Sequence, residues 1–147
     1  MVKEKLFDKR QPNIRYGKRI GAYIIPVRTD GTIPVVRTPR GIFLLGGGVE
    51  KGESHEECIK RECLEEIGAE VLVGSLKCKS DRYHYAARFS RHMHTTSYFY
   101  TGELLGSVCE PTETNHELIY LSQDECCEKL FLKNQIWAVK VILGVDE

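Results

Sequence analysis

The chain has 147 residues, 41% of them hydrophobic and 29% charged, a composition typical of one soluble domain with a real core. Lys plus Arg and Asp plus Glu each number 21, so no net charge would draw the whole chain to nucleic acid or to an anionic membrane. No apolar run approaches the length of a membrane span, and the polar start does not lead into a signal-peptide core. We expect a single domain over 1–147, located in the cytoplasm.

The first third of the chain alternates short apolar runs with turn signals. Residues 1–18 are polar and basic, are interrupted by Pro12, and predict an extended arm or an edge strand that could take part in a homodimer. The apolar runs that follow are rich in β-branched residues, and they predict strands at 20–27, 33–37 and 41–45. The last of these strands leads into a run of three glycines.

A helix is expected directly after the glycines, over about 54–67. Ser54 is a good N-cap residue, and Glu57, three residues later, completes a capping box. Gly68 suits the left-handed position that follows a helix. The local sequence therefore defines both ends of this helix.

Three carboxylates share one face of this helix. Glu62, Glu65 and Glu66 stand at i, i+3 and i+4, so their side chains are neighbours and repel one another unless a cation lies between them. Taken alone, the same string could be a solvated acidic face on a surface helix. The pattern favours a metal site but leaves both interpretations open.

The remainder of the chain predicts more strands and then helices. A basic loop is expected over 86–94, Ser122 and Glu125 repeat the capping-box signature, and Asn134 could cap a last helix. Strands are expected at 70–76, 81–85, 95–104 and 118–121. Strands thus precede, surround and follow one central helix, which favours the α/β class, with a mixed sheet covered by helices on both faces.

The stretch 46–69 as a whole is more specific than any of its parts. Its fixed positions are Gly47, Glu53, the pair Arg61-Glu62, the pair Glu65-Glu66, and Gly68. This spacing resembles the Nudix box of the MutT-like hydrolases, although Cys63 and Ala69 stand where aliphatic residues are usual. The resemblance implies a Nudix-type α/β/α sandwich with a central mixed β-sheet, and outside 46–69 it rests only on the order of the elements.

The resemblance also implies a metal-dependent site. The carboxylates of Glu62, Glu65 and Glu66 and the carbonyl of Gly46 would hold Mg²⁺ or Mn²⁺, which prefer oxygen ligands. Glu53 and Arg61 would complete the catalytic set by bracing the turn against the helix. Many family members add an acidic metal ligand or base from a late loop. The candidates are Glu113 and Glu117, ranked ahead of Glu110, and we predict Glu117 as the additional metal ligand.

Cations and aromatic rings gather between the box and that late loop. Arg82, Tyr83, Tyr85 and Arg88 could stack a base and hold phosphate, and we predict that they bind substrate. The alternative is a hairpin whose tyrosines pack on the sheet and whose charges are solvated.

The function implied by the resemblance is hydrolysis of the diphosphate linkage in a nucleoside diphosphate derivative, a nucleotide or a dinucleoside polyphosphate, by attack of water on phosphorus. Two alternatives stay open: a catalytically silent domain that binds a nucleotide as a sensor, and a pyrophosphohydrolase of RNA 5′ ends. The expected partner is therefore a nucleotide-type small molecule, with no membrane and no nucleic acid other than an RNA 5′ end.

The six cysteines form no CxxC motif and no zinc-type spacing with histidine. We interpret them as reduced, small core residues. Cys58 is the exception of interest, because it lies one turn before Glu62 and a thiol beside the acidic face could be sensitive to oxidation.

Overall fold

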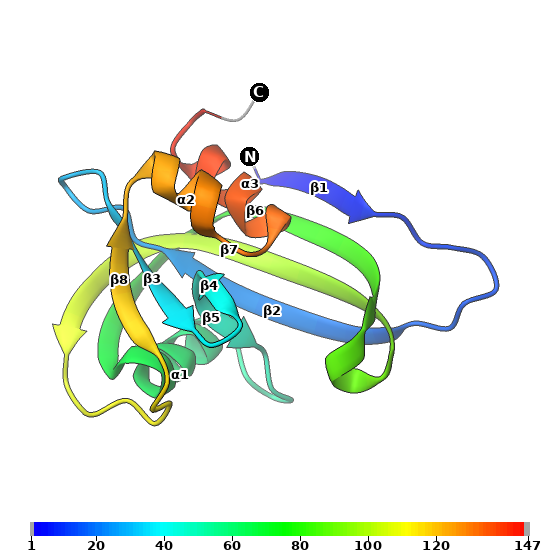
Figure 1. Ribbon diagram of the computed structural model, residues 1–147, viewed down its shortest axis with the longest axis horizontal. Coiled ribbons are helices and arrows are strands. Elements are labelled where there is room, and N and C mark those ends of the chain that lie inside the picture. The colour runs from blue at the N-terminus through cyan, green and yellow to red at the C-terminus, as the bar shows by residue number, and fades with distance from the viewer. Residues whose placement is uncertain (1, 146–147) are drawn as a thin grey trace.

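The computed structural model describes residues 2–145, which form two β-sheets and three α-helices (Figure 1). The larger sheet has the strand order β1-β6-β7-β2-β5, and the smaller one has the order β4-β3-β8. In chain order the strands are β1 (Lys3–Asp8), β2 (Gly17–Ile25), β3 (Ile33–Thr38), β4 (Gly41–Phe43), β5 (Leu45–Gly48), β6 (Ala69–Ala86), β7 (Arg91–Ser107) and β8 (Glu117–Leu121). The helices are α1 (His55–Ile67), α2 (Gln123–Lys129) and α3 (Lys133–Ile142), with a short 3₁₀ turn at Ala87–Phe89.

Alternation along β2 explains why helices cover both faces of the larger sheet. Ile24 and Ile25 are both fully buried, although successive side chains of a strand point to opposite faces. Ile24 belongs to a core cluster that includes Ile59 of α1, whereas Ile25 belongs to a second cluster that includes Trp137 of α3. Figure 1 shows α1 and the α2–α3 pair on opposite sides of the strands. The predicted α/β/α sandwich with a mixed sheet is confirmed.

The local signals around α1 are also confirmed. The Ser54 hydroxyl accepts a hydrogen bond from the Glu57 N–H at 3.1 Å, and the Ser54 N–H donates to the Glu57 carboxylate at 2.9 Å. Gly68 adopts φ +64, and an added Cβ there would collide with the carbonyl oxygen of Cys109. Gly68 therefore ends the helix and lets the 108–116 loop lie against it.

The segment 69–107 differs from its prediction. The strands expected at 70–76 and 81–85 are one 18-residue strand, β6, and the basic loop expected over 86–94 shrinks to the turn before β7. The pairing of β6 with β7 is irregular between Val73 and Leu76 and between Leu76 and Cys78. At these β-bulges the two strands stay paired, but the alternation of buried and exposed side chains along β6 changes phase. Those bulges interrupt the alternation in sequence, which is why two strands were expected.

The N-terminal segment is part of the larger sheet. β1 pairs in parallel with β6 at the edge of the larger sheet, so the N-terminal segment is an edge strand rather than a free arm.

The prediction that Asn134 caps α3 is wrong, because Leu132 is the N-cap residue and the Asn134 side chain is buried, donating to the Ser80 hydroxyl at 3.2 Å. Within residues 2–145, no helix has the length and apolar character needed to cross a membrane.

Candidate active site

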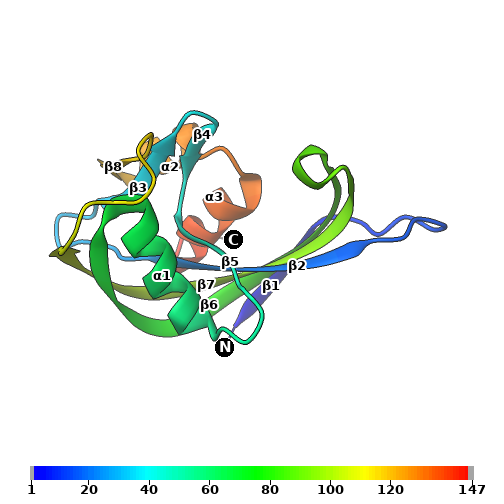
Figure 2. The same ribbon diagram turned by 90° about the horizontal axis from the view of Figure 1, so that it is seen from below.

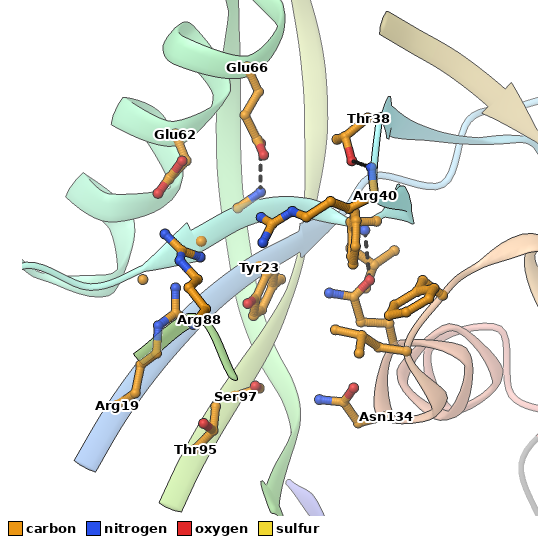
Figure 3. A pocket seen from close by; sticks show the side chains of 18 of the residues that line it. Arg19, Tyr23, Thr38, Arg40, Glu62, Glu66, Arg88, Thr95, Ser97 and Asn134 are labelled. Carbon is orange, nitrogen blue, oxygen red and sulfur yellow. Dashed lines mark hydrogen bonds between the residues drawn. The ribbon is translucent and has the colours of Figure 1, made fainter. Parts of the chain in front are cut away.

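A cavity of about 1040 Å³ opens where the glycine strand, α1, the β6–β7 hairpin and the start of α3 meet (Figure 3). Gly46, Gly47 and Gly48 form part of its lining, with the carboxylates of α1 on one side. The segments that line it are far apart in the chain, from Arg19 on β2 to Gln135 on α3. The fold therefore creates this cavity by joining parts of the chain that are distant in sequence.

Glycine is required where β5 passes the acidic helix. Gly46 has φ +135, and a Cβ at this position would collide with the carbonyl oxygen of Ala22 on β2. A Cβ on Gly47 would collide with the Glu62 carboxylate. Backbone and carboxylates can approach each other closely here only because the side chains are missing.

Two of the box carboxylates are held away from water. Burial, reinforced by repulsion from Glu62 and Glu113, raises the pKa of Glu66 well above its ordinary value, although the Gly46 N–H donates to its Oε1 at 3.2 Å. Burial also raises the pKa of Glu62, while the Arg61 guanidinium opposes that shift. Figure 3 shows both side chains directed from α1 toward the glycine strand. A cation placed there would relieve both penalties.

Arg61 links the helix to the glycine turn. Its guanidinium donates to both Glu53 oxygens, with Nε–Oε2 at 2.6 Å and Nη2–Oε1 at 3.0 Å, and Nη2 also donates to the Gly48 carbonyl at 3.0 Å. Nη1 lies 3.3 Å from the Glu65 carboxylate. The hydrogen bond from Arg61 lowers the pKa of Glu53 to about 2. These contacts agree with the bracing role predicted for Glu53 and Arg61.

The donor set suits a hard divalent cation. Glu62, Glu65 and Glu66 supply carboxylate oxygens beside the backbone of Gly46, and desolvation already disfavours the charges on two of them. Among residues 2–145, no group of three or more His, Cys, Asp or Glu side chains is already arranged to hold a metal ion. The Glu65 carboxylate instead accepts a hydrogen bond from Arg61 Nη1 at 3.3 Å.

The late loop supplies Glu113 rather than Glu117. Glu113 lines the cavity, its charge raises the pKa of Glu66, and its N–H donates to the Glu65 carbonyl at 2.9 Å. Glu117, predicted as a metal ligand, lies on β8, is largely exposed, and pairs with Arg37 at 3.0 Å. It is absent from the cavity lining, because strand pairing with β3 holds it at the surface; Glu110 is absent from that lining too.

The hairpin divides the predicted substrate residues between its two faces. Arg82 and Arg88 line the cavity, whereas Tyr83 and Tyr85 do not. Tyr83 stacks on His94 with ring centroids 4.2 Å apart, and Tyr85 packs edge-on against His92. Strand alternation turns Arg82 and His84 toward the cavity and the two tyrosines away from it. The structure therefore gives no support to the tyrosines as a stacking platform in this cavity.

Sequence reasoning missed several cavity residues. Arg19 and Arg40 supply further positive charge, and the Phe43 and Phe131 rings meet with centroids 5.6 Å apart. The carboxamides of α3 line the same region; Gln135 Oε1 accepts a hydrogen bond from the Leu44 N–H at 2.9 Å. Their positions depend on long-range strand pairing. The one available signal was strand alternation, which places Arg19 four residues before the partly buried Tyr23 and on the same face.

Cys58 is a core residue. It is fully buried, and burial raises the pKa of its thiol to about 12. The expected sensitivity to oxidation is not supported, because the reactive form of cysteine is the thiolate. Cys63, Cys78 and Cys126 are also fully buried.

The cavity places desolvated carboxylates beside a glycine strand and next to several arginines. These groups suit the class of enzymes that hydrolyse phosphoanhydrides, because the carboxylates can hold a cation and the arginines can hold phosphate. Residues 17–138 match the model of the NUDIX domain family. The chain belongs to this family, and it is a Nudix hydrolase.

Solved structures with the same fold support this assignment. A MutT NUDIX hydrolase from Burkholderia pseudomallei is 26% identical, with 86% of this chain and 98% of that chain covered and a TM-score of 0.66. A UDP-X diphosphatase is 26% identical, with 91% and 68% covered and a TM-score of 0.65. An ADP-ribose pyrophosphatase from Streptococcus suis shares the fold at 19% identity, with 88% and 93% covered and a TM-score of 0.62. No curated protein matches the chain.

Proposed function

We propose that this Nudix hydrolase cleaves the diphosphate linkage of a nucleotide derivative by water attack on phosphorus, with Mg²⁺ or Mn²⁺ as its cofactor. The observation that carries the proposal is the pair of desolvated carboxylates, Glu62 and Glu66, facing the glycine strand inside a cavity lined by arginines. The named activities of the UDP-X diphosphatase and the ADP-ribose pyrophosphatase agree with this class of substrate.

Each side chain has a task in this reaction. Glu62, Glu65 and Glu66, with the Gly46 carbonyl, would hold the cation, which supplies charge neutralisation on the phosphoryl oxygens and a more acidic water. Glu113 is the candidate for holding the proton of that water, because it lines the same cavity beside Glu66. Arg61 and Glu53 would hold the glycine turn and α1 in the same relative position during the reaction.

The opposite end of the cavity suits a nucleobase. The Phe43 and Phe131 rings offer apolar faces there, and Asn134 and Gln135 offer carboxamide groups. Because Gln135 Oε1 accepts a hydrogen bond from the Leu44 N–H, the orientation of its carboxamide is fixed. Aromatic faces combined with fixed amide groups bind a base by stacking and edge hydrogen bonds.

The test is turnover of a substrate panel with Mg²⁺ by the wild type and by Glu66→Gln. The panel should contain nucleoside triphosphates, nucleotide sugars, dinucleoside polyphosphates and triphosphorylated RNA. We expect metal-dependent release of a nucleotide or phosphate product that the variant loses. If the wild type is as inactive as the variant on every compound while still binding nucleotide, the proposal fails and the chain is a sensor.

A further inference from the structure

The β6–β7 hairpin forms a cationic wall of the cavity. Figure 2 shows its far end, which contains the 3₁₀ turn, curling out of the plane of the sheet and facing α3 across the molecule. The residues that this hairpin contributes to the lining include Arg82, His84, Arg88 and Phe89. The carboxylates of the cavity come from α1, the turn after β5 and the late loop, and the hairpin adds none of them.

Three arginines of the cavity have no carboxylate partner. Arg19, Arg40 and Arg88 form no ion pair within 4.0 Å with any carboxylate of residues 2–145, whereas Arg61 pairs with Glu53 and Arg82 pairs with Asp8 at 3.3 Å. The Arg19 charge lies close enough to the Tyr23 hydroxyl to counteract part of the rise in its pKa that burial causes. The unpaired arginines come from three elements that are distant in the sequence, so their convergence is a property of the fold.

Their side chains line the same cavity beside the glycine strand. Figure 3 shows Arg19 and Arg88 reaching the same region next to the strand, below Glu62, while Arg40 extends toward it from the other side. Like charges brought together without counterions favour an anion between them. Planar guanidinium groups bind phosphate oxygens through paired hydrogen bonds, which makes phosphate the best-matched anion.

The two ends of the cavity therefore differ in chemistry. Asn134 lies on the α3 side of the cavity, whereas Arg19 and Arg88 lie on the opposite side, below Glu62 (Figure 3). Phe131 lies just before α3, and its ring meets that of Phe43. A nucleotide bound with its base on α3 would extend its phosphates toward Arg88. A substrate with only two phosphates and a neutral sugar would place an uncharged group there.

We propose, resting on the proposed function, that Arg88 and Arg19 form a subsite for an anionic phosphate beyond the scissile diphosphate. The preferred substrates then carry three or more phosphates in a row, in place of a diphosphate linked to a neutral sugar. Arg88 is the specificity residue of this subsite, because it stands at the exposed hairpin tip while Arg19 lies within β2 of the sheet.

The test measures binding, so that it does not depend on turnover or on knowing the base. The probes are methylene-bridged, non-hydrolysable analogues of tripolyphosphate and of pyrophosphate, titrated by calorimetry in the presence of Mg²⁺. We expect the wild type to bind the longer analogue at least about 10-fold more tightly, since hydrogen bonds to charged groups are worth about that much in affinity. Arg88→Gln should remove most of that preference.

Arg91→Gln is the matched control. Arg91 is also an exposed hairpin arginine, three residues from Arg88, but it lies against Gly17 and outside the cavity lining. This variant should keep the wild-type preference. The proposal is overturned if the wild type binds neither analogue, if it binds both equally, or if Arg88→Gln retains the preference. If the wild type keeps the binding preference but turns over none of the nucleotide substrates, the result counts against the proposed function and leaves the phosphate subsite in place.

Discussion

On the α1 side of the cavity an arginine is paired with carboxylates of the protein itself, whereas on the hairpin side an arginine lines the cavity without such a pair. Arg61 is bonded to Glu53 and to the glycine turn, so this wall is fixed before anything binds. Arg88 and Arg19 have no such carboxylate partner among residues 2–145. Internal pairing fixes the geometry of the α1 side of the cavity, which we call the fixed wall. The unpaired charge of Arg88 gives the hairpin side its affinity for an anion.

The largest effect should come from Glu66→Gln, which removes one charge from the fixed wall and keeps its shape. We expect kcat to fall at least about 100-fold, as in losses of single charge-stabilising groups in other active sites. The unfolding midpoint of the metal-free protein should stay the same or rise, because burial no longer penalises a charge and the amide oxygen can still accept from Gly46. Activity assays and thermal melts measure the two effects.

The control for that variant is Glu56→Gln on the solvent side of the same helix. Glu56 is exposed and pairs with Lys60 at 2.8 Å, away from the cavity. Its loss should leave kcat within about 2-fold, since exposed ion pairs contribute little. Equal losses in the two variants would contradict the assignment of Glu66 to the site.

Replacing Arg61 by Lys should loosen the fixed wall. Lysine keeps the positive charge but cannot donate to both Glu53 oxygens and to the Gly48 carbonyl together. We expect the free energy of unfolding to fall by about 2 kcal/mol, measured by urea denaturation. Arg37→Lys, at an exposed pair with Glu117, should cost no more than about 0.5 kcal/mol. A similar loss in the free energy of unfolding for the two variants would show that the contacts of Arg61 contribute no more to stability than an exposed ion pair does.

The pH dependence of stability should distinguish the two kinds of carboxylate in the fixed wall. Glu62 and Glu66 have folded-state pKa values above the ordinary 4.5, so without metal their contribution weakens as pH rises from 4.5 through the raised pKa. Glu53 behaves oppositely: its stabilisation is present above 4.5 and is lost as pH falls toward 2. Thermal melts in EDTA from pH 4.5 to 8 should show the first trend, and Mg²⁺ or Glu66→Gln should reduce it.

The smallest effect should follow thiol modification. The exposed Cys109 should react first with a mild alkylating reagent, while the buried Cys58 and Cys63 should be protected in the native protein. Activity should change by less than about 2-fold, because Cys109 does not line the cavity. Peptide mass spectrometry locates the label, and rapid labelling of Cys58 would mean that the fixed wall opens readily.

The acidic wall was predictable because its determinants are local. Capping by Ser54, the left-handed Gly68 and the i, i+3, i+4 carboxylates all act within one helix, and the spacing of 46–69 adds the turn. The opposite wall depends on register. Whether Arg82 or Tyr83 faces the cavity follows from how β6 pairs with β7, including its bulges, and composition alone could not decide it.

The choice of Glu117 failed for a related reason. The sequence showed several glutamates in one late segment, but only tertiary structure shows that Glu113 lies against α1 while Glu117 lies on a strand paired with β3. Asn134 was read as a cap from its residue type, yet packing buried it against Ser80. In both cases contacts between distant segments overrode a local preference.

The parallel pairing of β1 with β6 has a consequence for folding during synthesis. Lys3 lies opposite Cys78, so the first strand leaves the ribosome long before its neighbour exists. Closing so long a loop is slow, and β1 must wait without its partner while the rest of the sheet forms. Its charged residues, Lys3, Glu4 and Lys5, protect it from pairing with other chains during that interval.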